Sequence, residues 1–402
     1  MKKGWQNISF GELGRVFNGN SISEAEKKAH FEGVEDGVPY IGTKDVSFEH
    51  EVAYESGVKI PDDKRDGFKL APANTVLVCA EGGSAGRKIA HTDREIYFGN
   101  KLFAVCPSPP ISSRLIFYYC LSGDFTKQFK GSMAGLIGGV SINKFKELSV
   151  PVPPLAEQQR IVGLLDEAFE GLATAQANAE KNLQNARALF ESHLQSVFTQ
   201  RGPGWVEKPL GDFCSFENGD RGTNYPSKST RTATGIPFIN AGHLTDDGID
   251  LETMDFIPRE RFDLLSNGKI RKGDILFCLR GSLGKFASVG DLSEGAIASS
   301  LVIVRPDKTV LNDFLVAYFR SPLCTAMINR FKNGAAQPNL SAQSLRNFIA
   351  PVPPLAKQES VVEQLTDLRE ETQRLARLYE RKLAALEALK KSLLHQAFTG
   401  AL

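Results

Sequence analysis

The sequence predicts an α+β fold in which two β-rich globular domains are separated by two long antiparallel helices that form a coiled coil. Three observations lead to this fold class. The chain contains an internal repeat, the first part of each repeat is rich in short β runs, and the second part has the pattern of one long helix. Its 402 residues are enough for two or three domains. Together these features predict two related halves with a pseudo-twofold internal repeat.

The repeat is clearest in the segment Pro-Val-Pro-Pro-Leu-Ala, which occupies residues 151–156 and recurs at residues 351–356. Trp5 matches Trp205 at the same offset of 200 residues. A fixed period indicates a duplicated structural unit. We therefore interpret the chain as one unit of about 200 residues that is present twice.

Each unit divides into a β-rich part and a helical part. Runs such as 75–79, 274–278 and 300–304 are rich in β-branched and aromatic residues and are bounded by turn residues. The proline-rich segment ends a strand and starts a helix, because proline lacks a backbone donor but is tolerated in the first helical turn. The predicted segments are a first domain at 1–153, a spacer helix at 154–200, a second domain at 201–353 and a second helix at 354–402.

Both helices carry apolar residues at spacings of three and four, in the same phase in the two copies. Two matching seams predict that the helices pack on each other as a coiled coil. The alternative is that each seam packs on its own domain. The residues assigned to helix pairing or partner docking are Ile161, Leu165, Leu172, Leu183, Phe190, Val361, Leu365, Leu368, Leu375 and Leu386.

Composition argues against several classes of protein. Forty-eight basic and 47 acidic residues give a net charge of +1, so any nucleic-acid-binding surface must be local. The six cysteines and six histidines show no metal-ligand spacing, and no phosphate-binding loop motif is present. No run approaches a membrane span. We expect no catalytic residue, no metal and a cytoplasmic location.

Polar loops recur in both halves, and each combines glycine with basic or amide side chains. Glycine allows close backbone approach to a ligand, while Arg and Lys can contact phosphates or the acceptor edge of guanine. The bland alternative is an exposed hairpin. We predict base contacts from Arg221, Asn224, Arg231 and Arg280, and phosphate contacts from Arg87, Lys88, Lys101 and Lys285. Three further candidates for DNA contacts are Asn20, Lys44 and Ser282.

The duplicated junction carries a family resemblance over essentially the whole chain. The pattern P-x-P-P-L-x-E-Q-x-x-I-V fits the first copy fully, and the differences of the second copy from the first include Lys357, Ser360 and Val361. With a β-rich domain before each junction and a long helix after it, the chain resembles the specificity subunit of type I restriction-modification systems.

The resemblance implies two target recognition domains, each reading one half of a bipartite, interrupted site in double-stranded DNA, with the helices setting the spacing. It implies a non-catalytic chain that binds two modification subunits, which methylate adenine with S-adenosylmethionine. Restriction subunits that use ATP and Mg²⁺ would join this core, so this chain itself would hold no cofactor. Two alternatives stay open: a protein–protein scaffold without DNA readout, and a subunit with a hydrolase or nuclease site of its own.

Overall fold

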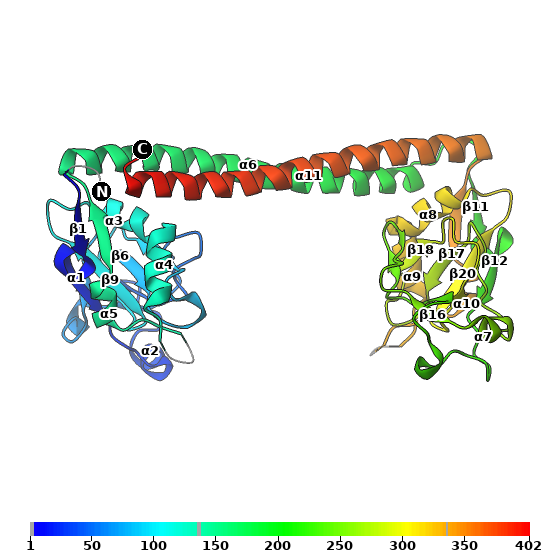
Figure 1. The fold of residues 1–402 in the computed structure, drawn as a ribbon, viewed down its shortest axis with the longest axis horizontal. Helices are drawn as coiled ribbons and strands as arrows, with labels where there is room; N and C mark the ends of the chain where they lie inside the picture. Colours follow the sequence, from blue (N-terminus) through cyan, green and yellow to red (C-terminus); the bar gives the residue numbers. More distant parts are fainter. Residues whose placement is uncertain (1–3, 135–137, 335–336) are drawn as a thin grey trace. The chain divides into compact units, whose positions relative to one another are not determined.

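The computed structural model describes residues 4–134, 138–334 and 337–402, and none of the helices in these ranges is long and apolar enough to cross a membrane. The chain forms two compact units. Unit 1 contains residues 1–180 and 380–402, and unit 2 contains residues 181–379. Each unit therefore combines one β-rich domain with the beginning of one long helix and the end of the other (Figure 1).

The β-rich part of unit 1, from β1 to β10, is called domain 1 below. An antiparallel sheet has the strand order β2-β9-β6-β7, a second sheet has the order β4-β3-β8-β5 with β3 and β8 parallel, and β1 pairs with β10. The strands are β1 (Gln6–Ser9), β2 (Gly14–Asn18), β3 (Val38–Ile41), β4 (Lys59–Ile60), β5 (Leu70–Ala71), β6 (Val76–Cys79), β7 (Ile89–His91), β8 (Ile96–Phe98), β9 (Leu102–Pro107) and β10 (Ser149–Val152). The short helices are α1 (Phe10–Leu13), α2 (Glu24–His30), η1 (Asp62–Lys64), η2 (Gly82–Ser84), α3 (Ser113–Cys120), α4 (Gly123–Gly131) and α5 (Ile142–Glu147).

The β-rich part of unit 2, from β11 to β21, is called domain 2. Its main antiparallel sheet has the order β12-β20-β17-β18, and a second sheet has the order β16-β13-β19 with β13 and β19 parallel. The strands are β11 (Val206–Pro209), β12 (Cys214–Asn218), β13 (Ile236–Ile239), β14 (Leu244–Thr245), β15 (Gly248–Ile249), β16 (Asp255–Ile257), β17 (Ile275–Cys278), β18 (Phe286–Ser288), β19 (Ala296–Ile297), β20 (Leu301–Pro306) and β21 (Ile349–Val352). The short helices are η3 (Leu210–Asp212), η4 (Lys228–Thr230), α7 (Arg259–Asp263), α8 (Asn312–Arg320), α9 (Pro322–Phe331) and α10 (Ala342–Arg346).

Serine caps start equivalent helices in the two domains. Ser122 accepts a hydrogen bond from the backbone of Phe125 at the start of α4, and Ser321 accepts one from Cys324 at the start of α9. A side-chain oxygen at this position satisfies a backbone donor that the first helical turn leaves without a partner. The repeated local chemistry therefore produces repeated helices.

The proline-rich junction ends a strand and starts a long helix in both copies, as predicted. β10 ends at Val152 and α6 runs over Leu155–Thr199, while β21 ends at Val352 and α11 runs over Leu355–Thr399. The glutamine of the repeated motif is buried in each copy and joins the start of the long helix to its domain. Gln158 accepts a hydrogen bond from the backbone of Ser112 at 2.9 Å and donates one to the carbonyl of Pro153 at 3.0 Å.

The copy of this glutamine in unit 2 makes one more hydrogen bond. Gln358 accepts from the backbone of Leu311 at 2.8 Å and donates to the carbonyl oxygens of Thr309 and Pro353, both at 2.9 Å. Because an amide side chain both donates and accepts, one residue satisfies the strand end, the helix start and a domain loop together. This explains why the motif requires glutamine at this place.

Within each unit the two helix segments run antiparallel, because the beginning of one long helix and the end of the other pack on the same domain (Figure 1). In unit 1, Phe398 near the end of α11 enters the core beside Ile161 of α6, and its ring lies 5.1 Å from that of Tyr119. In unit 2, Phe198 near the end of α6 packs at 6.0 Å from Tyr318, between the ring centroids. Each domain core is thus completed by a phenylalanine from the other repeat's helix.

The seam residues named above are buried or half-buried without exception. Ile161, Leu165, Val361 and Leu365 are at most 5% exposed and belong to the domain cores, so at the helix starts the seam faces both its own domain and the other helix. Both arrangements considered from the sequence therefore hold there. The half-buried seam residues are Leu172, Leu183, Phe190, Leu368, Leu375 and Leu386.

Candidate nucleic-acid interface

A polar hollow of about 600 Å³ opens at one end of the main sheet of domain 2. It lies where β12 and β17 end and where the chain enters α10. Among the residues that the structure describes, its polar lining carries guanidinium, amide and hydroxyl groups and no carboxylate. These side chains are Asn218, Arg221, Arg280, Gln337, Asn339, Ser341 and Gln343.

Two of the predicted base-contacting residues meet in this hollow. The guanidinium groups of Arg221 and Arg280 both donate to the carbonyl oxygen of Ser299, at 3.3 Å and 2.9 Å. Each contact uses one nitrogen of the guanidinium, and both side chains are exposed. Since arginine carries five donors in a fixed fork, each retains donors that can pair with the acceptor edge of guanine.

Sequence reasoning missed three of the four amide side chains of this hollow, Gln337, Asn339 and Gln343. Amides pair with the donor and acceptor on the adenine edge, so they extend the range of bases that the hollow could contact. A signal was available in the repeat. Asn339 forms a β-bridge with Arg280, and Gly139 forms the equivalent bridge in domain 1. The two copies keep the same backbone pairing at this position, but one copy has an amide side chain and the other has glycine. The backbone pairing therefore belongs to the shared fold, while the side chain differs between the copies.

The other predicted contacts of domain 2 lie outside this lining. Arg231 forms an ion pair with Asp255 at 2.7 Å and its guanidinium stacks over the ring of Phe238. The Asn224 amide donates to the carbonyl of Leu264 at 3.2 Å. These side chains help to hold domain 2 together. Ser282, in contrast, is exposed in the turn between β17 and β18.

A lysine makes the same contact in both domains. Lys88 donates to the carbonyl of Thr43 at 2.9 Å, and Lys285 donates to the carbonyl of Ala241 at 3.1 Å. Both lysines thus attach the β6–β7 or β17–β18 turn to the loop that follows β3 or β13. A cation held in this way still presents charge to a phosphate, although its position is set by the domain.

In domain 1 the predicted residues are dispersed over separate contacts. The Asn20 amide donates to the carbonyl of Gly67 and accepts from the backbone of Lys69, both at 2.8 Å, so its polar atoms are occupied. Lys101 pairs with Glu81 at 3.1 Å. Arg87 stacks over the ring of Phe48, at 4.9 Å from the ring centroid.

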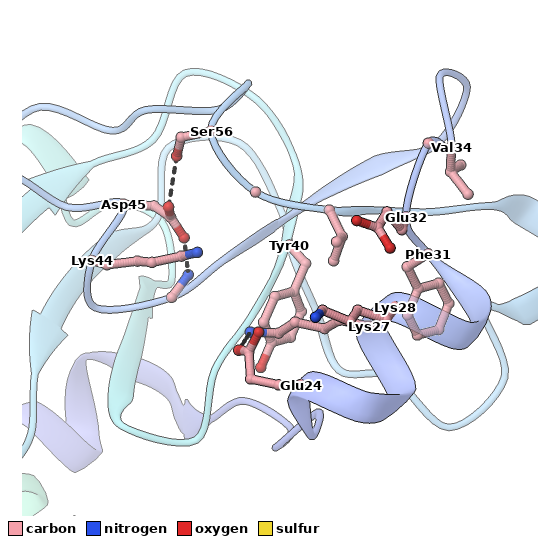
Figure 2. Close-up of a pocket in the computed structure, with 14 residues that line it drawn as sticks. Glu24, Lys27, Lys28, Phe31, Glu32, Val34, Tyr40, Lys44, Asp45 and Ser56 are labelled. Atoms are coloured by element: carbon pink, nitrogen blue, oxygen red, sulfur yellow. Dashed lines mark hydrogen bonds and ion pairs between the residues drawn. The ribbon is translucent and has the colours of Figure 1, made fainter.

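Lys44 lies on the rim of a separate cavity of about 290 Å³ in domain 1, between α2 and the loop after β3 (Figure 2). Glu24 and Lys27 form an ion pair at 2.8 Å beside the ring of Tyr40, and Asp45 accepts a hydrogen bond from Ser56. Three lysines face three carboxylates here: Lys27, Lys28 and Lys44 against Glu24, Glu32 and Asp45. The balanced charges give this cavity no preference for an anion.

The cysteine thiols are poor nucleophiles and poor metal ligands as placed. Burial raises the pKa of Cys79 and of Cys278, which lie at equivalent strand ends, and all six cysteines are free thiols. Among residues 4–134, 138–334 and 337–402, no three His, Cys, Asp or Glu side chains are grouped so that they could hold a metal ion.

A family model described as the type I restriction modification DNA specificity domain matches residues 2–182 and, a second time, residues 203–381. The chain belongs to this family. The two matches fall on the two repeats, so each repeat carries one specificity domain and part of its long helix.

Named relatives are similar over most of their length. The type I restriction enzyme EcoBI specificity subunit of Escherichia coli is 22% identical over 432 residues, covering 99% of this chain and 86% of that protein. The EcoKI specificity subunit of E. coli strain K12 is 23% identical over 364 residues, covering 84% and 76%.

Two solved structures share the fold of this chain. One comes from work on complex assembly and conformational transition of the type I R-M system, with a TM-score of 0.79, 20% identity and coverage of 100% of this chain and 99% of that one. The other is the HsdS subunit of Thermoanaerobacter tengcongensis, with a TM-score of 0.64, 20% identity and coverage of 100% and 98%.

Proposed function

We propose that this chain is the DNA-reading subunit of a type I restriction-modification complex, in which each β-rich domain contacts one half of a bipartite DNA site. The observation that carries the proposal is the pair of equivalent sheet ends with different polar side chains. Domain 2 presents arginines and amides there, and domain 1 presents a glutamate and a lysine. A shared backbone frame with different hydrogen-bonding groups suits two readers of different short sequences.

The proposed chemistry belongs to the partners. Two modification subunits would dock on the long helices and methylate adenine with S-adenosylmethionine, and restriction subunits would supply ATP- and Mg²⁺-dependent translocation and cleavage. This chain would position them and carry out no bond-making step itself. Its six free thiols support a reducing compartment, the cytoplasm, for the assembly.

The decisive experiment measures which DNA the assembled complex methylates. The full chain is produced with its modification subunits and incubated with a randomised double-stranded DNA library, and methylated adenines are located by sequencing. We expect one interrupted, two-part motif. Uniform methylation across the library, or binding without sequence preference, would favour the protein-scaffold alternative.

The eight loop residues assigned specifically to base or phosphate contacts are tested in the same assay. Arg87, Lys88, Lys101 and Lys285 should each lower affinity for all sequences and flatten the salt dependence when replaced, because phosphate contacts release counterions whatever the sequence. Arg221, Asn224, Arg231 and Arg280 should instead relax the second half-site alone. Arg231 is the most demanding test of these assignments, because its guanidinium is already paired with Asp255 and would have to contact a base as well.

The nuclease alternative has its own test. Cleavage of DNA by the purified chain with Mg²⁺ alone would support a nuclease site in this chain.

A further inference from the structure

The backbone around Glu81 defines a fixed position at the end of the main sheet of domain 1. The thiol of Cys79 donates to the carbonyl oxygen of Glu81 at 3.4 Å, and Glu81 forms a β-bridge with Gly139. The preceding residue, Ala80, donates its backbone N–H to the carbonyl of Lys101 at 2.9 Å. The thiol contact lies within this short segment, and the other two contacts attach the segment to its neighbours.

The same three contacts surround Arg280 in domain 2. The thiol of Cys278 donates to the carbonyl oxygen of Arg280 at 3.1 Å, and Arg280 forms a β-bridge with Asn339. The preceding residue, Leu279, donates its backbone N–H to the carbonyl of Ser300 at 2.8 Å. Glu81 and Arg280 thus occupy one position in the repeated fold, with opposite charge and opposite hydrogen-bonding character.

We propose that this shared position is a base-reading position in both domains, with Arg280 selecting guanine in one half-site and Glu81 selecting cytosine in the other. The inference rests on the proposed DNA-reading function and assigns its specificity to named residues. In the major groove, guanine presents two acceptors that match the arginine fork, and cytosine presents an amino donor that a carboxylate accepts. Opposite side chains at one backbone position would then give the two halves different sequences.

The surroundings of both side chains fit this role. The side chain of Glu81 is half exposed, and it is paired at 3.1 Å with Lys101, whose side chain is also largely exposed. A carboxylate near DNA is repelled by phosphates, and the lysine beside it offsets that repulsion. Arg280 is exposed and anchored by one hydrogen bond to Ser299, which restricts its rotamers while leaving other donors available.

Two glutamine substitutions test the proposal in the full chain assembled with its modification subunits. The probe is a double-stranded DNA library randomised at each position of the motif that the wild-type complex methylates. Glutamine pairs with adenine through one donor and one acceptor. We expect Glu81→Gln to change one position of one half-site from cytosine towards adenine, and Arg280→Gln to change one position of the other half-site from guanine towards adenine. Loss of the bidentate contact of Arg280 should reduce discrimination by about 5-fold to 150-fold at its position.

Matched controls remove the same charge at the opposite end of the same hairpins. Glu95 is exposed beyond the end of β7, and Lys272 pairs with the exposed Asp291 near the start of β17. We expect Glu95→Gln and Lys272→Gln to leave the motif unchanged. Thermal unfolding of all four variants should match the wild type, because each replaced side chain is exposed.

The outcomes separate this inference from the function on which it rests. If the wild-type complex methylates no sequence-specific motif, the proposed function fails. If the wild type has a motif and the two variants keep it, or weaken all sequences equally, the base-reading assignment of Glu81 and Arg280 is wrong. If both substitutions change the same half-site, the assignment of one residue to each half is wrong.

Discussion

Domain 1 and domain 2 repeat the same four-stranded sheet but stabilise the start of its central strand with different chemistry. In domain 1, the hydroxyl of Thr75 lies 3.2 Å from the sulfur of Cys106, in a small neutral contact. At the equivalent places in domain 2, Asp274 and Arg305 form two hydrogen bonds of 2.7 Å and 3.0 Å. The frame therefore tolerates either a neutral or an ionic pair.

In domain 2 the pair of Asp274 and Arg305 is part of a larger network of charged side chains that also includes Glu217. Burial raises the pKa of Asp274, although the hydrogen bonds from Arg305 oppose the shift. Burial also acts on Glu217, yet hydrogen bonds from Arg305 at 2.7 Å and from two backbone N–H groups hold its pKa below the usual value. One arginine thus holds two carboxylates. Loss of Arg305 should therefore destabilise domain 2 more than loss of Thr75 or Cys106 destabilises domain 1.

The largest effect should come from the exchanged phenylalanines, because each completes the core of the domain that it enters. Phe398→Ala should destabilise unit 1 by about 3–5 kcal/mol, through lost burial and the cavity that remains. Phe198→Ala should do the same to unit 2. The two tryptophans report the units separately, since Trp5 packs on the core of unit 1 and Trp205 on that of unit 2. Denaturant unfolding is followed by fluorescence in Trp205→Phe or Trp5→Phe backgrounds.

The same measurement tests whether the end of each long helix packs on the domain of the other repeat. If Phe398→Ala lowered the stability that Trp205 reports and spared the one that Trp5 reports, each helix end would belong to the other unit. Leu189→Ala is a suitable control, because Leu189 is an exposed apolar residue of α6 and its truncation creates no cavity.

A smaller effect is expected from the ionic contact of domain 2. Arg305→Gln leaves the carboxylate of Asp274, which is 3% exposed, without its charged partner. The expected cost is about 3 kcal/mol, at the lower end for a broken buried pair because Arg305 is itself partly exposed. Cys106→Ala at the equivalent place of domain 1 should cost about 1 kcal/mol, the net value of one weak hydrogen bond. Equal costs in the two variants would show that the charge network adds nothing.

The junction glutamines also make different numbers of hydrogen bonds in the two units. Methionine has nearly the same shape as glutamine but cannot make its hydrogen bonds. Gln358→Met leaves one backbone donor and two carbonyls unpaired, whereas Gln158→Met leaves one donor and one carbonyl. We expect costs of about 1–3 kcal/mol in both, with unit 2 losing about 1 kcal/mol more. Denaturant midpoints of the single-tryptophan variants measure the difference, and a larger loss in unit 1 would contradict it.

Much of the helical frame was predictable because its causes are local. A proline pair ends a strand and starts a helix within a few residues, and apolar spacing of three and four identifies the buried side of a helix without tertiary information. The helical segments were expected at 154–200 and 354–402, and the helices are observed at Leu155–Thr199 and Leu355–Thr399. Because the sequence repeats, each prediction made for the first half could also be made for the second half.

The side chains of the candidate site were harder to assign, because exposure and pairing depend on residues far away in the sequence. Arg231 is paired with Asp255, 24 residues later, and Asn20 with the loop at Gly67, 47 residues later. A polar residue in a glycine-rich loop has the same local pattern whether it supports the fold or faces a ligand. Gln337 became a candidate only when folding placed it in the same hollow as Arg280.

The smallest expected effect distinguishes the domains by pH. His91 in β7 pairs with Val76 across the sheet of domain 1, and the equivalent pair in domain 2 is Ser288 with Ile275, so this position can titrate only in domain 1. Burial, assisted by the nearby Arg114, lowers the pKa of His91 from 6.5 to about 4.

Between these two pKa values the unfolded chain binds a proton at His91 that the folded domain does not, so folding stability rises with pH across this window. Unit 1 should therefore lose stability as the pH falls from about 6.5 towards 4, and burial of His50, with Lys390 nearby, lowers its pKa and acts in the same direction. Replacing His91 by the residue of the other domain, His91→Ser, should reduce this loss while the response of unit 2 stays the same. Denaturant unfolding at pH 7 and pH 5, followed by Trp5 fluorescence in a Trp205→Phe background, measures it. An unchanged pH dependence in His91→Ser would mean that the acid sensitivity of unit 1 arises elsewhere, since serine cannot take up the proton that the argument assigns to His91.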